Sequence, residues 1–135
     1  MEGFINLSFD GTSKGNPGST GLGGLFRDSQ TYTRLIYVDY YGYASNNEVE
    51  FAAIKQGLQI AIRMGYRNIM VEGDSSLVIS TLTKLNHDTK WDKLSQSWRT
   101  ARIIQEIGEL IHNFDYIMAN HVRWEGKKAK KFLAN

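Results

Sequence analysis

The sequence predicts an α/β fold, with a five-stranded mixed sheet and helices on both of its faces. Two observations support this prediction. The first third of the chain contains three strand-like segments separated by turn residues, which is typical of an antiparallel meander. From residue 45 onwards, helical and strand-like segments alternate, which predicts two further strands that pair in parallel and are reached through helical crossovers.

The first three strands are predicted at residues 4–10, 22–27 and 33–41. In the first of them every second residue from Ile5 is apolar, which is the period of a half-buried strand. The third is rich in β-branched and aromatic residues. Residues 11–18 are expected to form a loop, because the single proline of the chain lies there in the turn-like sequence Gly-Asn-Pro-Gly.

A first helix is predicted to begin at Ser45 and Asn46, which are typical N-cap residues, and to end near Gly65. Its apolar residues recur at helical spacing. They are Phe51, Ile54, Leu58 and Ala61.

The remaining elements are predicted in the order strand, helix, helix, strand, helix. The two strands are expected at residues 68–73 and 115–122, and Asp74 or Ser75 is expected to cap the helix between them that runs to about residue 85. The apolar spacing of residues 103–111 predicts a third, longer helix. A last helix is expected at residues 128–134.

Composition indicates one globular domain, residues 1–135, because 41% hydrophobic and 22% charged residues are ordinary values for such domains. The sequence has no apolar run long enough to span a membrane and no signal peptide, so we expect an intracellular protein that does not bind membranes. The sequence contains no cysteine, which excludes disulfides, thiolate metal ligands and a cysteine nucleophile. The compartment within the cell is left open.

The net charge of +2 is unevenly distributed. Residues 121–135 contain five lysines and arginines and one acidic residue, whereas acidic residues slightly outnumber basic ones in the rest of the chain. A basic segment on a slightly acidic body suggests a polyanionic partner. A solvated helix face would have the same composition, so both interpretations remain open here.

Three acidic residues lie where strands end or a helix begins: Asp10, Glu50 and Asp74. Each alone is weak evidence, because such positions also favour acidic residues as turn formers, N-caps or partners of the helix dipole. Strand ends and helix starts can meet at one edge of a mixed sheet. Together, the three carboxylates therefore suggest a site for Mg²⁺ or Mn²⁺, which prefer oxygen ligands.

Four sequence motifs resemble those of the ribonuclease H type 1 family. The first is residues 9–18, Phe-Asp-Gly-Thr-Ser-Lys-Gly-Asn-Pro-Gly, and the second is residues 46–53, Asn-Asn-Glu-Val-Glu-Phe-Ala-Ala. The third is residues 71–75, Val-Glu-Gly-Asp-Ser, and the fourth joins His121-Val122 to Leu-Ala-Asn at 133–135. Their order and spacing match over essentially the whole chain. The second and fourth motifs are most similar to retroelement-type ribonuclease H-like domains of plants, a retrotransposon-like character.

The resemblance implies a ribonuclease H-like fold and a metal-dependent endonuclease that hydrolyses the RNA strand of RNA/DNA hybrids. It implies that Asp10, Glu50 and Asp74 bind two Mg²⁺ or Mn²⁺ ions, with Asp10 bridging them. His121 resembles the catalytic histidine of a mobile loop that assists product release. Glu48 aligns with a non-catalytic position.

The resemblance also implies residues that bind nucleic acid. Asn16 and Asn46 resemble side chains that contact the minor groove and the DNA backbone of the hybrid. Ser45 and Asn46 lie at a predicted helix N-terminus, which can hold a phosphate. We place Lys127 and Lys130 with them as phosphate contacts. The expected partner is an RNA/DNA hybrid or another nucleic acid, bound by a monomer.

The fourth motif departs from the family pattern at Lys131. The family has a fourth carboxylate ten residues after the histidine, and this position is Lys131 here, while Lys127 replaces a usual asparagine. A cation opposes metal binding, so the second ion is doubtful and the nuclease is expected to be impaired. One alternative is a degenerate module that binds nucleic acid without cleaving it, and another is a protein-binding scaffold. The sequence does not distinguish a natural from an introduced Lys131.

Overall fold

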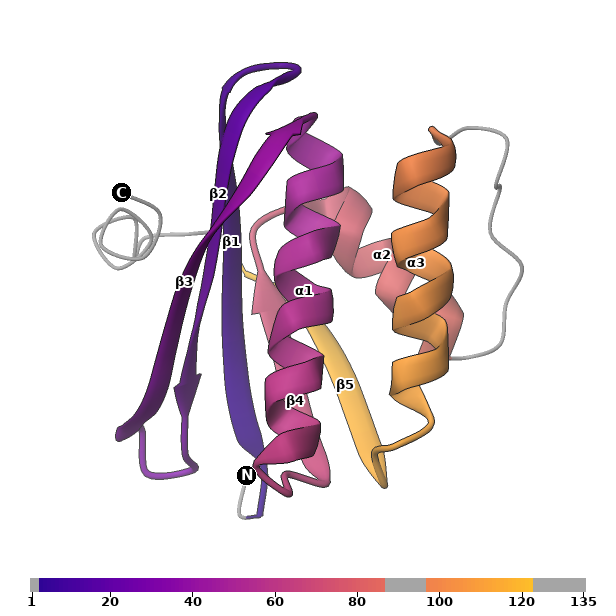
Figure 1. Ribbon diagram of the computed structural model, residues 1–135. Helices are drawn as coiled ribbons and strands as arrows, with labels where there is room; N and C mark the ends of the chain where they lie inside the picture. The colour runs from indigo at the N-terminus through magenta and orange to yellow at the C-terminus, as the bar shows by residue number, and fades with distance from the viewer. Residues whose placement is uncertain (1–2, 87–96, 123–135) are drawn as a thin grey trace.

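The computed structural model describes residues 3–86 and 97–122. It has five strands and three helices in these residues (Figure 1). In chain order they are β1 (Ile5–Gly15), β2 (Gly18–Arg27), β3 (Thr33–Ala44), α1 (Asn46–Arg63), β4 (Asn68–Gly73), α2 (Ser76–Asn86), α3 (Trp98–Ile111) and β5 (Tyr116–His121).

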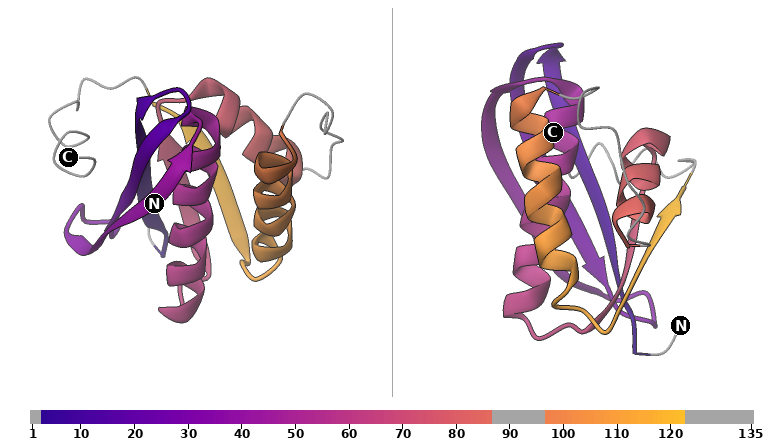
Figure 2. Two further views of the ribbon diagram at one scale, coloured as in Figure 1. Left: turned by 45° about the horizontal axis from the view of Figure 1, so that its top comes forward. Right: turned by 90° about the vertical axis from the view of Figure 1, so that its right-hand side faces the viewer.

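The five strands form one mixed sheet in the order β3-β2-β1-β4-β5. The pairs β1–β2 and β2–β3 are antiparallel, whereas β1–β4 and β4–β5 are parallel. The prediction of a meander extended by two parallel strands is therefore confirmed. The three described helices gather on one side of the sheet, as the views in Figure 2 show. The helix predicted at residues 128–134 lies outside the described residues.

The predicted loop at residues 11–18 is wrong. β1 continues to Gly15 and β2 begins at Gly18, and these two glycines face each other across a tight hairpin turn at Asn16-Pro17. The added residues of β1 are polar and do not alternate, so they carry no periodic signal. They are held by the backbone ladder to β2 rather than by burial of apolar side chains.

The helix ends follow the predicted capping residues. The Ser45 side chain caps α1 and accepts a hydrogen bond from the Glu48 amide, and beyond the helix Gly65 adopts a positive φ of 78°. At α2 the cap is Ser75 rather than Asp74, since its Oγ accepts from Val78 N at 3.3 Å. α3 starts before its apolar run because Ser97 caps it.

The core lies between the sheet and the helices. Its largest fully buried side chains include Leu7, Phe26, Ile54, Leu58 and Ile104, and burial of each such side chain contributes about 1.5–3 kcal/mol. No helix in the described part of the chain is long and apolar enough to cross a membrane.

Helix α1 approaches the sheet closely at Gly57. A Cβ there would lie 2.6 Å from a methyl of Leu7 and from the Tyr37 hydroxyl, so a larger residue would push the helix outward. The Tyr37 hydroxyl donates to the Ala53 carbonyl at 2.7 Å, which satisfies a buried polar group at this contact. These contacts fix the distance between α1 and the sheet. They thereby help to position the residues at the N-terminus of α1.

Candidate active site

The three predicted acids do come together. One carboxylate oxygen from each of Asp10, Glu50 and Asp74 lies within 4.8 Å of the other two. Asp10 is only 2% exposed, and the other two are half-buried. They come from β1, the first turn and a half of α1, and the residue after β4.

The strand register explains why the two aspartates meet. Ser8 in β1 pairs with Glu72 in the parallel strand β4. Asp10 lies two residues after Ser8, and Asp74 lies two residues after Glu72. Residues two apart on a strand point to the same face. Parallel neighbours in register therefore place both carboxylates side by side at one edge of the sheet.

Gly11 explains how Glu50 reaches the aspartates. A Cβ at Gly11 would lie 2.9 Å from the carbonyl carbon of Val49 and 3.0 Å from the amide nitrogen of Glu50. Only a glycine lets the first turn of α1 approach β1 so closely. The backbone contact beside Asp10 fixes the start of the helix next to the strand.

The donor set fits a hard divalent cation. All three groups offer carboxylate oxygens, and the cluster is only partly exposed, so a bound cation would relieve repulsion among charges held close together. Asp10, Glu50 and Asp74 can hold Mg²⁺ or Mn²⁺. The identity and number of ions remain predictions.

His121 lies beside this cluster at the end of β5. Its backbone pairs with Gly73, and its Nε2 lies 3.1 Å from the carbonyl oxygen of Asp74. The side chain is exposed. The histidine therefore lies at the same edge of the sheet as the acids and is accessible from solvent, while its catalytic role stays a prediction.

The predicted nucleic-acid-binding residues of the hairpin and of α1 also come together. The Asn46 backbone amide donates to the Asn16 side chain at 3.2 Å, and Ser45 is the neighbouring cap. Asn16 thus occupies one of the amide donors that a phosphate at this helix N-terminus would use. The other predicted positions, Lys127, Lys130 and Lys131, lie outside the described residues.

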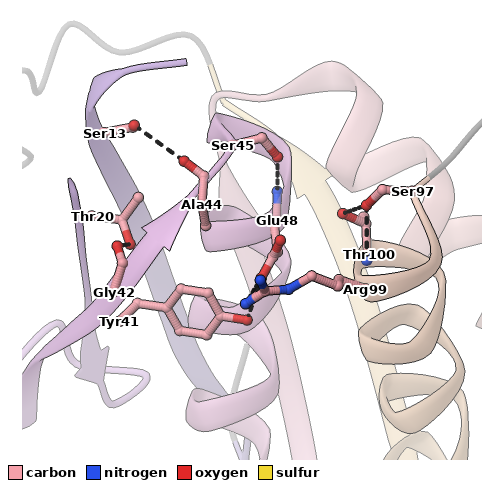
Figure 3. A network of polar contacts seen from close by, with 10 residues as sticks. All are labelled: Ser13, Thr20, Tyr41, Gly42, Ala44, Ser45, Glu48, Ser97, Arg99 and Thr100. Atoms are coloured by element: carbon pink, nitrogen blue, oxygen red, sulfur yellow. Dashed lines mark hydrogen bonds and ion pairs between the residues drawn. The ribbon is translucent and has the colours of Figure 1, made fainter. Parts of the chain in front are cut away.

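Sequence reasoning missed a polar network around the buried Glu48, which lies two residues before the predicted metal ligand Glu50 (Figure 3). Glu48 has a side chain only 6% exposed, and its Oε2 accepts a hydrogen bond from the Tyr41 hydroxyl at 2.7 Å. Arg99 of α3 lies 3.3 Å from the same oxygen. Burial, and secondarily the Glu48 carboxylate, raise the pKa of Tyr41 to about 12. No sequence signal joins these residues, since Arg99 lies far along the chain.

Comparison with protein families and curated proteins gives matches over most of the chain. A family described as "Reverse transcriptase-like" matches residues 8–135. A ribonuclease HI of Halobacterium salinarum is 31% identical over 133 residues, which cover 98% of this chain and 63% of that protein. A ribonuclease H of Tropheryma whipplei is 36% identical over 119 residues, covering 81% of this chain and 66% of its own length. The chain thus spans about two thirds of the length of these relatives.

Solved structures give the same grouping. The crystal structure of RNase H1 from Halobacterium salinarum superposes with a TM-score of 0.85 at 30% identity, covering 98% of this chain and 95% of that one. LC11-RNase H1, solved in complex with an RNA/DNA hybrid, shares the fold with a TM-score of 0.73 at 23% identity, covering 97% and 94% of the two chains. The predicted likeness to plant retroelement-type domains stays a prediction. With a family match from residue 8 to residue 135, this chain belongs to the ribonuclease H type 1 family.

Proposed function

We propose that this chain is a metal-dependent endonuclease that hydrolyses the RNA strand of RNA/DNA hybrids. The observation that carries the proposal is the cluster of Asp10, Glu50 and Asp74, whose ligand atoms lie within 4.8 Å of one another. Membership of the ribonuclease H type 1 family supports the reaction class. A relative of the same fold, LC11-RNase H1, was solved with an RNA/DNA hybrid, which supports the substrate class.

We assign all three acids to metal binding, and their places in the fold support this assignment. Asp10 is buried on β1, while Glu50 approaches from α1 and Asp74 from the residue that follows β4. Asp10, Glu50 and Asp74 would hold Mg²⁺ or Mn²⁺, which would supply Lewis-acid activation of water and stabilisation of the leaving oxygen. We assign His121 a role in proton exchange with the reacting phosphate or in product release, and its exposed position beside Asp74 supports this assignment.

Recognition of the hybrid uses the same edge of the molecule. The N-terminus of α1 brings together Asn16, Ser45 and Asn46. Asn46 lies four residues before Glu50, which belongs to the acid cluster. Amide donors and side-chain oxygens at such a helix end read backbone and groove shape rather than base sequence. We therefore expect sequence-independent binding.

A second candidate is a module that binds nucleic acid without cleaving it. The observation that favours it is the basic composition of residues 121–135, with Lys131 at the place of the fourth family carboxylate. Both candidates share a substrate and differ only in chemistry.

A substrate panel separates the two candidates. The full chain is incubated in Mg²⁺, and separately in Mn²⁺, with an RNA/DNA hybrid, single-stranded RNA and duplex DNA, each with a labelled strand. We expect endonucleolytic cuts in the RNA strand of the hybrid alone, abolished by chelation. Hybrid binding without any cut, in either metal, would replace the nuclease by the binding module.

A matched pair of variants assigns the activity to the cluster. Asp10→Asn removes one ligand charge and should lower the cleavage rate by about a hundredfold to a thousandfold. Asp115→Asn removes an aspartate that pairs with Arg67 at 2.9 Å before the start of β5, at the opposite end of that strand from His121, and should leave cleavage intact. Equal rates for these two variants would contradict the assignment.

A further inference from the structure

We infer that Glu48 is a positioning residue for the metal site, acting through Tyr41 and Arg99 on the first turn of α1. The inference rests on the proposed function, since it concerns the metal that this function requires. It assigns a role to a buried acid that the predicted chemistry leaves unused.

The first turn of α1 is held from two opposite sides. Glu48 and Glu50 are two residues apart on a helix with 3.6 residues per turn, so their side chains leave the axis in nearly opposite directions. Glu50 points toward the aspartates, and Glu48 points toward β3 and α3, where Tyr41 and Arg99 lie. Figure 3 shows this second arrangement, with Tyr41 and Arg99 converging on the Glu48 carboxylate.

The strand side of the turn is fixed by packing rather than by charge. Val49, which lies between the two glutamates, is fully buried, and its backbone lies against Gly11. That packing limits how near the helix comes to β1. Buried residues further along α1, such as Ile54 and Leu58, set the rotation of the helix as a whole, and the Glu48 side chain holds the first turn from the other side.

The Glu48 contacts are suited to hold the first turn in this orientation. One carboxylate oxygen of Glu48 accepts a hydrogen bond from the Tyr41 hydroxyl at 2.7 Å and lies 3.3 Å from an Arg99 nitrogen. Residues of both β3 and α3 therefore hold the Glu48 side chain. If the first turn of α1 rotated about the helix axis, these interactions would break and Glu50 would move away from Asp10 and Asp74. Holding Glu48 in place therefore holds Glu50 in place.

The same turn also carries the capping hydrogen bonds. The Glu48 backbone amide donates to the Ser45 side chain at 3.2 Å. The backbone amide of Asn46, the residue after Ser45, donates to the Asn16 side chain. The network thus connects the metal ligand to the end of the helix that we propose to contact the hybrid. Groups that orient a metal ligand without touching the metal typically affect affinity by about 10–100-fold.

Tyr41→Phe is the most informative variant. It removes one hydroxyl, retains the ring and changes no charge, so a change in metal binding cannot come from altered electrostatics at the cluster. Tyr43→Phe removes a hydroxyl from an exposed tyrosine of the same strand and is its matched control. Glu106→Gln breaks the other ion pair between α1 and α3, Lys55 to Glu106 at 3.1 Å, and controls for a general loosening of the two helices.

The test measures Mg²⁺ binding by calorimetry, without nucleic acid, alongside thermal unfolding. We expect Tyr41→Phe to weaken Mg²⁺ binding by about tenfold, the low end of the range for such groups, and Glu48→Gln to weaken it at least as much. Both controls should bind Mg²⁺ as the unaltered chain does. Should Glu48→Gln fail to fold, Tyr41→Phe alone decides.

Two results would overturn the inference, and they differ. If the unaltered chain binds Mg²⁺ and Tyr41→Phe binds it equally well, Glu48 only stabilises the fold, and the proposed function stands. If the unaltered chain neither binds Mg²⁺ nor cleaves the hybrid, the proposed function fails and the inference fails with it.

Discussion

Tyr41 shows how a single side chain reports on the network at the start of α1. Its hydroxyl donates to the buried Glu48 carboxylate, and burial together with that negative charge favours the neutral phenol. The pKa is raised from its ordinary value near 10 to about 12 in the folded chain. The neutral form is therefore favoured by folding, and the corresponding stability is present below pH 10.

This shift predicts a loss of stability at alkaline pH. As pH rises from 10 to about 12, the unfolded chain ionises this tyrosine while the folded chain still holds it neutral, so the free energy of unfolding falls. Tyr41→Phe removes the titrating group, so urea unfolding at a series of pH values should show a shallower alkaline fall. Equal slopes for the variant and the unaltered chain would contradict the assigned environment. Burial also raises the pKa of Tyr37, so Tyr37 contributes to the fall that remains.

A second prediction for a single residue concerns Lys131 and comes from the sequence alone. If it occupies the place of the fourth family carboxylate, Lys131→Asp restores a ligand charge and should raise both Mg²⁺ affinity and hybrid cleavage. Calorimetric titration and a cleavage assay check both quantities. No gain in either would show that Lys131 is not at the ligand position or that activity is limited elsewhere.

Among the elements, β1 and α1 depend on Gly11 for their close approach. A methyl group at this position would meet backbone atoms of Val49 and Glu50 at 2.9 and 3.0 Å, and backbone cannot yield as a flexible side chain can. We predict that Gly11→Ala costs about 1–3 kcal/mol of stability through overpacking and also weakens Mg²⁺ binding, because Glu50 moves away from Asp10.

Gly21→Ala is the control for this prediction. Gly21 lies on β2 opposite Thr12, and an added Cβ would come no nearer than 3.7 Å to another atom, the carbonyl oxygen of Asp39. Chemical denaturation and Mg²⁺ titration should therefore distinguish the two variants. If both behave alike, the close approach at Gly11 is not what places Glu50.

The elements also show which parts of the fold the sequence can predict. The strand at residues 68–73 is predicted with its observed bounds, because its apolar alternation is bounded by polar turn residues. Asp10 and Asp74 can be paired from the sequence because both are predicted to close parallel strands; β1 in fact continues past Asp10, but its pairing with β4 stops at Ser8 and Glu72. The extension of β1 to Gly15 cannot be predicted in this way, since a polar strand end gains its stability from pairing with a partner that the local sequence does not reveal.

The same limit explains the missed network. Glu48 has the sequence environment of an ordinary first-turn acid, and nothing local distinguishes it from an exposed one. Its burial depends on Tyr41 from β3 and Arg99 from α3, which only the packed fold brings together. The proposed metal ligands are predictable from motifs, but the groups that we infer to hold them in place are not.

Considered as a whole, the molecule brings its predicted site residues together at one edge of the sheet. The acid cluster and His121 lie at the end where the parallel strands β4 and β5 finish, and the first turn of α1 lies against Gly11 beside them. The sequence places a concentration of positive charge in residues 121–135, directly after β5. We therefore predict that hybrid binding weakens steeply as salt concentration rises, because binding to phosphates releases counterions.

The lysines predicted to bind phosphate should contribute to the slope of log affinity against log salt concentration, which can be measured. Replacing Lys127 and Lys130 by alanine should flatten the dependence of log affinity on log salt by about one unit for each phosphate that is no longer neutralised. Fluorescence anisotropy with a labelled hybrid across a salt series gives the slope. An unchanged slope would show that these lysines face solvent and would remove the main support for a basic nucleic-acid surface.

The central claim is that Asp10, Glu50 and Asp74 act as one metal site for hydrolysis of the hybrid. Single-turnover cleavage in Mg²⁺ by Asp10→Asn, Glu50→Gln, Asp74→Asn and the triple variant tests it most directly. Each single variant should lose about a hundredfold to a thousandfold in rate, and the triple variant should lose little more, because ligands of one site act as a unit. Losses that multiply across the three positions, or a single variant that keeps the full rate while folded, would contradict it.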